Sequence, residues 1–466
     1  MNSKEALVEK IHNCVPWEPG LASSLVIFGF QEPSKSWKDF ISLAKCTDFN
    51  KLYPNFFSSL LDLSARSHNA DLVLHNLERF VEKFKEKEHL FTQLSESKSL
   101  LKSLVYLFSG SQILTDSLLS EPSHVNWLGQ PEVLTESKSK DILMRDFYEM
   151  AGEDFHKSET SKLLRKFKKR EYIRIGLRDL LGTAELMETV GDISNLADVC
   201  LQIAYEKADR DLQKKHGIPS YKDTDGNLQI SEFAVIGMGK LGGQELNYSS
   251  DIDLIYIYTS SHGETRPEPF KENEVITITN HEYFSKLARQ ITKYINEITD
   301  EGNVFRVDLD LRPDGPSGEI ASSLASCETY YQSWGKTWER QAMIKARVSA
   351  GSEALGRQFF SMMEPFIYRR SLDFEAIEKI KSMKNRINKS LKDKNLGKIN
   401  IKLGFGGIRE VEFIIQAYQL LFGGRNKELR IRGSLRALEA LKEKNIINEE
   451  DFLRLSEAYI FLRHLE

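Results

Sequence analysis

Two aspartates, one residue apart, give this sequence its clearest chemical signal. Asp251 and Asp253 precede the apolar run Leu254–Tyr258, which is typical of a central strand. Residues two apart in a strand share a face, so the two carboxylates point the same way. Such carboxylates repel each other unless a cation lies between them, and Mg²⁺ and Mn²⁺ prefer oxygen ligands. The spacing therefore predicts a divalent metal site, and the alternative is a surface strand with two exposed acids.

A second strand, expected over 304–311, supplies further acids. Its charged residues alternate with apolar ones, so Asp308 and Asp310 share one face with Arg306 and Arg312. We expect this strand beside the one that carries the paired aspartates, where another carboxylate would complete a site for two metal ions. A surface strand with alternating salt bridges is the alternative.

The glycines before the aspartates raise the question of which nucleotide they hold. Gly237, Gly239 and Gly242 match the G-x-G-x-x-G pattern of dinucleotide-binding sites, which needs a helix and a second strand before an acid about 20 residues on. Only 244–250 separate Gly243 from the first aspartate, too short a segment for that crossover. A Walker loop also fails, because no lysine and serine or threonine follow. We expect a glycine turn, one short helix and then the strand.

The elements around this motif are mostly helical. The sequence has 466 residues, enough for more than one domain. Apolar residues recur at three- and four-residue steps at both ends of the chain, whereas strand-like segments lie between them. We therefore predict an α+β fold that is mostly helical, with a small sheet. The predicted domains are an N-terminal helical region (1–130), a catalytic domain (131–354) and a C-terminal helical domain (355–466).

Composition and charge limit the classes of function. Charged residues make up 28% and the formal net charge is -4, which argues against a protein that coats nucleic acid or an anionic membrane. No apolar run reaches the roughly 18 residues of a membrane span, and the first residues lack the apolar stretch of a signal peptide. Four widely spaced cysteines indicate free thiols. We expect a cytoplasmic protein with no nucleic-acid or membrane partner.

The end of the sequence is helical in period up to Glu466, with no stop signal. We therefore expect the natural chain to continue beyond it.

Several blocks of the sequence resemble one enzyme family. The glycine turn and its aspartates read GMGKLGGQELNYSSDID, and the later acids lie in RVDLDLRPDGPSG. Further blocks are WERQAMIKARVSAG, IKLGFGGIREVEFIIQ and LRIRGSLRALEAL. Together they resemble the glutamine synthetase adenylyltransferase/adenylyl-removing enzymes of the DNA polymerase β-like nucleotidyltransferase superfamily. The resemblance covers roughly residues 100–466 and implies a nucleotidyltransferase domain flanked by helical domains.

Members of this family carry two catalytic halves. The order of the blocks and the wording GGIREVEF imply the half that removes AMP from adenylylated glutamine synthetase by phosphorolysis, which consumes inorganic phosphate and releases ADP. The alternatives are the half that attaches AMP from ATP, another nucleotidyltransferase, and a non-catalytic helical scaffold. The family also implies the nitrogen-signalling PII protein as a partner.

The resemblance implies roles for individual residues. Asp251, Asp253 and Asp308 would hold two Mg²⁺ or Mn²⁺ ions, and Asp310, which replaces a usual arginine of the motif, is the alternative third ligand. The residues expected to bind nucleotide or phosphate are Gly239, Lys240, Gly242, Gly243, Ser249, Ser250, Arg312, Arg340, Lys345 and Arg347. For these cations the alternative is salt bridging to nearby acids. Arg409 and Glu412, three apart on a helix, are expected to pair at a domain interface.

Overall fold

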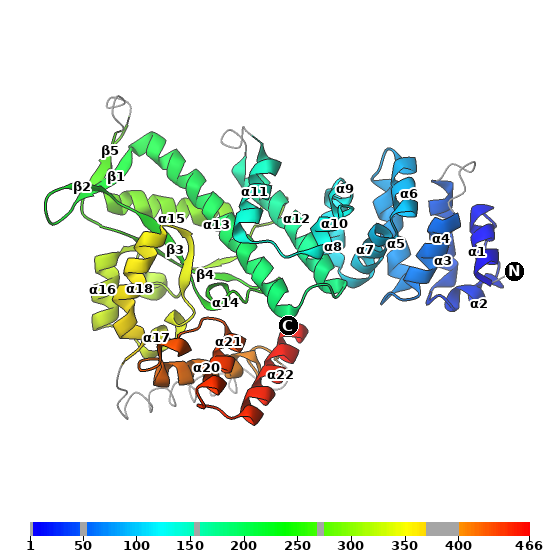
Figure 1. Ribbon diagram of the computed structural model, residues 1–466. Helices are drawn as coiled ribbons and strands as arrows, with labels where there is room; N and C mark the ends of the chain where they lie inside the picture. The colour runs from blue at the N-terminus through cyan, green and yellow to red at the C-terminus, as the bar shows by residue number, and fades with distance from the viewer. Residues whose placement is uncertain (1–2, 47–53, 153–158, 268–274, 370–399) are drawn as a thin grey trace. The chain divides into compact units, whose positions relative to one another are not determined.

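A computed structural model of the chain describes residues 3–46, 54–152, 159–267, 275–369 and 400–466 (Figure 1). The chain divides into two compact units. The first contains Met1–Ser137 and Phe167–Glu185, and the second contains Lys138–Lys166 and Leu186–Glu466. The predicted α+β fold, mostly helical with small sheets, is confirmed. The second unit includes the region predicted as a C-terminal domain and most of the region predicted as catalytic, of which 131–137 and 167–185 belong to the first unit.

The first unit is an array of short helices. They are α1 (Ser3–His12), α2 (Leu21–Val26), α3 (Pro33–Lys45), α4 (Pro54–Ser64), α5 (Ala70–Glu82), α6 (Lys87–Glu96), α7 (Lys98–Gly110), α8 (Gln112–Ser120), α9 (His124–Leu128), α10 (Pro131–Thr135) and the later part of α12 (Thr160–Leu180). Side chains of Asn69, Ser97 and Ser111 accept hydrogen bonds from backbone N–H groups of the first turn, so they begin α5, α7 and α8. The amphipathic helices, such as α3 and α5, bury one apolar stripe, which accounts for the periodicity of the sequence, whereas α12 is buried at every position of 171–178.

The second unit contains all the described strands. Its elements are α11 (Lys140–Ala151), the first part of α12, α13 (Leu186–His216), β1 (Ile218–Lys222), β2 (Leu228–Ile230), β3 (Phe233–Gly237), α14 (Gly239–Gly242), β4 (Ile252–Tyr258), β5 (Glu264–Arg266), α15 (Asn280–Asn296), β6 (Val307–Asp308), η1 (Gly315–Ser317), β7 (Ala321–Ser323), α16 (Leu324–Ser333), α17 (Thr337–Met343), β8 (Arg347–Gly351), α18 (Glu353–Ile367), α20 (Ile408–Phe422), η2 (Lys427–Leu429), α21 (Ser434–Glu443) and α22 (Glu449–Leu465).

The main sheet is mixed and has the order β6-β4-β3-β8, with β7 also pairing with β4. Strand β3 is antiparallel to β4 and β8, whereas β6 and β7 run parallel to β4. Strands β2, β1 and β5 form a separate small sheet. The predicted neighbourhood of the two acid-bearing strands is therefore present, because β6 pairs with the start of β4.

Helices cover both faces of the main sheet. On one face, Ile236 and Ile255 pack in a core with residues of α16 and α18. On the other face, Phe233 stacks on Phe284 of α15 and on Tyr205 of α13. Because β4 is covered on both sides, it is the central strand that the apolar run Leu254–Tyr258 predicts.

The predicted strand over 304–311 is much shorter in the structure. Only Val307–Asp308 pair with β4, and the chain turns immediately afterwards. The Asp308 carboxylate accepts a hydrogen bond from the Asp310 N–H at 2.7 Å, and Arg312 N–H bonds back to the Leu309 carbonyl. These local bonds take the place of strand pairing. The strand predicted from the alternation of charged and apolar residues is therefore too long.

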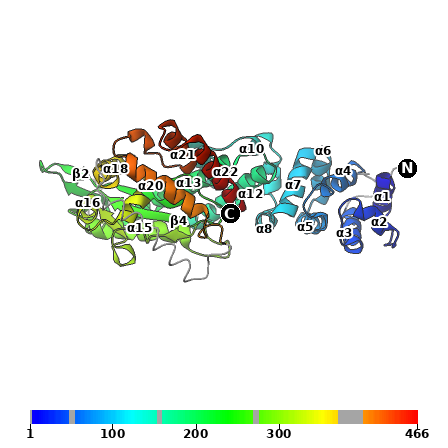
Figure 2. The same cartoon turned by 90° about the horizontal axis from the view of Figure 1, so that it is seen from below.

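Helices α20, α21 and α22 form a C-terminal group within the second unit (Figure 2). Ile415, Leu438 and Tyr459 are buried together in its core. No described helix combines the length and the apolar character needed to cross a membrane. The four cysteines are free thiols; Cys200 and Cys327 are buried, and Cys14 and Cys46 are half-buried.

Candidate active site

The glycine turn places the backbone directly against the paired aspartates. Gly239 has a φ of 52°, and a Cβ at this position would lie 2.5 Å from the Asp253 carboxylate. A Cβ on Gly242 would lie 2.2 Å from the Lys345 carbonyl oxygen. Both positions therefore need glycine, the first for its backbone conformation and its approach to the acid, the second for close packing against the segment before β8.

The expected phosphate cradle is only partly available. The Gly242 N–H donates to the Met238 carbonyl at 2.9 Å, and the Gly243 N–H donates to the Gly239 carbonyl at 3.1 Å. These two amides are used by the turn itself, which corrects the expectation that they face a ligand. Gly239 and Lys240 line the pocket described below.

The acids lie at the adjoining ends of β4 and β6. Asp253 is directly opposite Asp308 in the parallel pairing of these strands, so the two side chains leave the same face of the sheet. Burial, together with the charges of Asp308 and Asp251, raises the pKa of Asp253 to about 6. Asp310 is exposed and lies outside this pairing.

The carboxylate oxygens of the three aspartates suit a divalent cation, although the three carboxylates do not meet at one point. Asp251 is exposed, and its carboxylate bonds the Arg306 guanidinium, which also donates to the Ser249 carbonyl at 2.6 Å. Asp251, Asp253 and Asp308 do not all bring oxygens within 4.8 Å of one another, a spacing that Asp39, His75 and Glu78 of the first unit alone reach among the described residues. The three aspartates offer carboxylate oxygens, which suit Mg²⁺ or Mn²⁺.

A pocket of about 310 Å³ opens beside these acids. Asp251, Asp253 and Ser250 line it from the strand side, and residues 402–416 line it from the opposite side. The full lining is Gly239, Lys240, Ser250, Asp251, Asp253, Lys345, Lys402, Leu403, Ile408, Arg409, Glu412 and Gln416. The pocket is therefore formed jointly by the glycine turn, β4 and the start of the C-terminal helices.

Lys345 lines this pocket but is held by acids of the protein. Its ammonium donates to Glu245 at 2.7 Å, to Glu412 at 2.8 Å and to the Ser434 hydroxyl at 3.0 Å. Lys345 is 5% exposed and Glu245 is fully buried. All three donor positions of the ammonium are used, so the predicted phosphate contact is replaced by a buried ion cluster.

The other predicted cations also have partners inside the fold. Arg347 bonds the Asp198 carboxylate at 3.0 Å and the Leu241 carbonyl at 2.9 Å. Arg312 donates to the carbonyls of Leu309, Pro316 and Gly318, which holds the turn after β6. The buried Arg340 lies over the Phe366 ring, and burial lowers its pKa to about 10. None of the three lines the pocket beside the acids, so the structure favours the salt-bridge and packing alternatives.

The remaining predicted residues are divided between the pocket and its surroundings. The Lys240 ammonium lines the pocket and bonds the Glu466 carboxylate. Ser250 lines the pocket, whereas Ser249 is exposed and contributes its carbonyl to Arg306. Glu412 bonds Lys345, in place of the predicted pairing with Arg409.

Sequence reasoning missed Lys402 and the pocket position of Arg409. Both lie in the block IKLGFGGIREVEF, in a region expected to be a separate helical domain. Two glycines followed at once by a helix with basic residues at its start were a usable signal, because such a turn brings backbone and cations close to a ligand.

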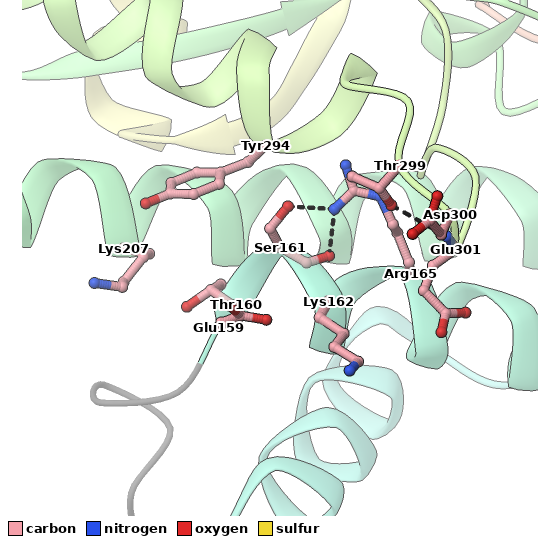
Figure 3. A pocket seen from close by; sticks show the side chains of 10 residues that line it. All are labelled: Glu159, Thr160, Ser161, Lys162, Arg165, Lys207, Tyr294, Thr299, Asp300 and Glu301. Atoms are coloured by element: carbon pink, nitrogen blue, oxygen red, sulfur yellow. Dashed lines mark hydrogen bonds between the residues drawn. The ribbon is translucent and has the colours of Figure 1, made fainter.

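A larger pocket, of about 580 Å³, lies at the start of α12 and contains none of these residues (Figure 3). Its charged groups have both signs, and the Arg165 guanidinium crosses it to bond the Ser161 and Gly302 carbonyls at 2.7 Å. This arginine joins α12 to the 299–302 turn. The pocket therefore offers no set of groups that favours one ligand.

Comparisons with known proteins give the family. The model of the family described as glutamate-ammonia ligase adenylyltransferase matches residues 101–362, and the model described as GlnD PII-uridylyltransferase matches residues 375–466. The first match contains the glycine turn and the acids of β4 and β6, and the second contains Lys402 and Arg409.

Similar proteins carry the name bifunctional glutamine synthetase adenylyltransferase/adenylyl-removing enzyme. The one from Nitrosococcus oceani is 41% identical over 392 residues, which is 84% of this chain and 39% of that protein. The one from Pseudomonas aeruginosa is 42% identical over 360 residues, 77% of this chain and 35% of that protein. The chain thus spans less than two fifths of the length of these relatives. With its nucleotidyltransferase-like fold, it belongs to the glutamate-ammonia ligase adenylyltransferase family.

Proposed function

We propose that this chain removes AMP from adenylylated glutamine synthetase by metal-dependent phosphorolysis, releasing ADP. The observation that carries the proposal is the opposition of Asp253 and Asp308 on paired strands, beside the glycine turn and a pocket, in a chain of this family. The order of the sequence blocks favours the removing half over the attaching half.

The proposed reaction exchanges one bond to phosphorus for another. An oxygen of inorganic phosphate attacks the phosphorus of the AMP group, and the bond from phosphorus to the tyrosine oxygen breaks. The tyrosine oxygen then takes up a proton, and the products are ADP and unmodified glutamine synthetase. Because phosphate is already an anion at neutral pH, the site needs charge stabilisation and positioning more than a general base.

The protein's own residues would prepare this step. Asp251, Asp253 and Asp308 would hold two Mg²⁺ or Mn²⁺ ions, which would supply the positive charge that stabilises the leaving tyrosine oxygen. Asp251 has to exchange the Arg306 guanidinium for such an ion, whereas Asp253 already faces the pocket. The glycine at 239 keeps the backbone close to the Asp253 carboxylate, where no larger residue fits.

We also infer that the PII signalling protein is a partner and that the reaction takes place in the cytoplasm. The match of residues 375–466 to the GlnD PII-uridylyltransferase model supports the first inference. The balanced charge of the chain supports the absence of a nucleic-acid substrate.

The test is a product assay with adenylylated glutamine synthetase, inorganic phosphate and Mg²⁺. The proposal expects ADP as the nucleotide product, with a rate that depends on phosphate. A parallel reaction with ATP and unmodified glutamine synthetase is expected to leave the tyrosine unlabelled. Release of AMP without phosphate would indicate hydrolysis, and labelling of the tyrosine from ATP would identify the attaching half.

A further inference from the structure

The pocket beside the acids is lined by charged groups of both signs, and Lys240, Lys345 and Glu412 among them are paired within the protein. Asp251 and Asp253 line it on the strand side, and Lys402 and Arg409 line it on the side of the C-terminal helices.

The backbone holds the two cations side by side. The Arg409 N–H donates to the Lys402 carbonyl at 3.2 Å, and the Ile408 N–H donates to the Ile401 carbonyl at 3.0 Å. The Asn400 side chain accepts from the N–H groups of Lys402 and Leu403 at 3.0 and 2.8 Å. The segment 400–409 is thus a closed turn that presents a lysine and an arginine together; we call it the basic turn.

Glycine is required to close the basic turn. A Cβ on Gly407 would lie 2.5 Å from the Ile401 carbonyl oxygen, and Gly406 has a φ of 72°. Arg409 follows in the first turn of α20, whose backbone dipole adds to the positive charge of the basic turn.

The cations of the basic turn differ from the others around the pocket. Both side chains belong to exposed residues, and neither makes an ion pair with a carboxylate within 4.0 Å among the residues that the structure describes. Lys345, by contrast, has its three donor positions taken by Glu245, Glu412 and Ser434. The basic turn therefore has donors that remain available to a ligand in the pocket.

The position of the basic turn is fixed before any ligand binds. Glu412 of α20 bonds the buried Lys345, and Gln416 of α20 accepts from Gln341 of α17 at 2.7 Å. Both contacts join α20 to residues 341–345, which lie shortly before β8. A turn anchored in this way can orient an anion without a large loss of conformational freedom.

We propose that Lys402 and Arg409 bind the inorganic phosphate that attacks the AMP group. This inference rests on the proposed phosphorolysis. A phosphate anion beside Asp251 and Asp253 would be repelled unless cations face it, and an arginine and a lysine supply several donors for its oxygens. Asp251 and Asp253 would then hold the metal ions, and Lys402 and Arg409 would bind the nucleophile.

The experiment compares Arg409→Gln, Lys402→Met and the conservative Arg409→Lys with the control Arg436→Gln. Arg436 is an exposed arginine of α21 that does not line the pocket, so the control removes the same charge from the same helical group. The readouts are the KM for phosphate, the KM for adenylylated glutamine synthetase, kcat, and binding of radiolabelled phosphate by equilibrium dialysis with Mg²⁺.

The proposal expects the KM for phosphate to rise about 10- to 100-fold in Arg409→Gln and Lys402→Met, with kcat changed less than about 3-fold. Arg409→Lys should recover part of the loss, and Arg436→Gln should behave as the unchanged chain. Dialysis should show the same ranking for phosphate binding.

Two results would overturn the inference while leaving the proposed function intact. One is an unchanged KM for phosphate in both variants. The other is a rise in the KM for adenylylated glutamine synthetase alone, which would assign these cations to the AMP group. If the unchanged chain yields no ADP at all, the proposed function fails, and the dialysis measurement still decides whether the basic turn binds phosphate.

Discussion

Two sets of cations lie in or near the pocket, and they differ in their partners. Lys345 and Arg347, near β8, are nearly or partly buried and bonded to Glu245, Glu412 and Asp198. Lys402 and Arg409, in the basic turn, are exposed and line the pocket together with Asp251 and Asp253. The first set joins distant parts of the chain, and the second offers charge to a ligand. Proximity to a catalytic acid therefore does not make a lysine or arginine a ligand-binding residue. A cation whose donors are already taken by carboxylates of the protein has none left for a ligand.

The acids give the largest predicted effect. Asp253→Asn should reduce ADP formation about a thousandfold or more, because the substitution removes a charge that would hold the metal while keeping the size of the side chain. Circular dichroism should show an unchanged fold. Activity near that of the unchanged chain would remove Asp253 from the site.

The buried cations should contribute mainly to stability. Lys345→Met leaves Glu245 and Glu412 without their cation, so the free energy of unfolding should fall by about 3–5 kcal/mol. Urea-induced unfolding measures this loss. The matched control is Lys442→Met, which breaks a more exposed pair with Glu449 and should cost no more than about 1 kcal/mol. Equal losses in the two variants would contradict the division between the two sets.

Variants of Asp308 and Asp310 test whether the third metal ligand lies in β6 or in the turn after it. Asp308 lies opposite Asp253, so Asp308→Asn should lower kcat about a hundredfold. Asp310 is exposed beyond β6, and Asp310→Asn should keep kcat within about 3-fold. Steady-state kinetics with saturating Mg²⁺ compares them. The reverse ranking would make Asp310 the third ligand.

A smaller effect concerns pH and stability without metal. The pKa of Asp253 is raised to about 6 in the folded state, so the folded chain holds this proton more tightly than the unfolded chain. The resulting stability is present below about pH 4 and is lost as the pH rises through about 6. At pH 8 in the presence of a chelator, the free energy of unfolding of Asp253→Asn should therefore exceed that of the unchanged chain by about 1–3 kcal/mol. The gain should vanish toward pH 4.

The exposed Asp251 provides the control for that measurement. Asp251→Asn in the same buffer should change the free energy of unfolding by less than about 0.5 kcal/mol. A similar gain in both variants would mean that repulsion among surface charges, and not burial of Asp253, causes the effect.

The acids could be predicted from the sequence because their arrangement is local. Alternation along a strand places Asp251 and Asp253 on one face, and the length of 244–250 excludes a crossover helix. The sequence also predicted that the segment with Asp308 lies beside β4, because its acids could complete a metal site only next to the strand that carries the paired aspartates. The strand length was overstated, because alternation cannot distinguish a strand from a turn held by Arg312.

The cations were harder to predict because their partners are far away in the chain. Arg347 bonds Asp198, 149 residues earlier, and Lys345 bonds Glu245, 100 residues earlier. No periodicity within a segment reports such a pair. The basic turn was assigned to a separate domain for the same reason: the contacts that bring it to the pocket, such as Lys345 to Glu412, depend on the folded arrangement.

The central claim is that inorganic phosphate is the nucleophile that removes AMP. The most direct measurement supplies ³²P-labelled inorganic phosphate and Mg²⁺ to the chain with unlabelled adenylylated glutamine synthetase, then separates the nucleotides. Phosphorolysis predicts labelled ADP, with the label in its β-phosphate and an amount equal to the tyrosine released. Unlabelled AMP as the product, or glutamine synthetase that keeps its AMP group, would contradict it.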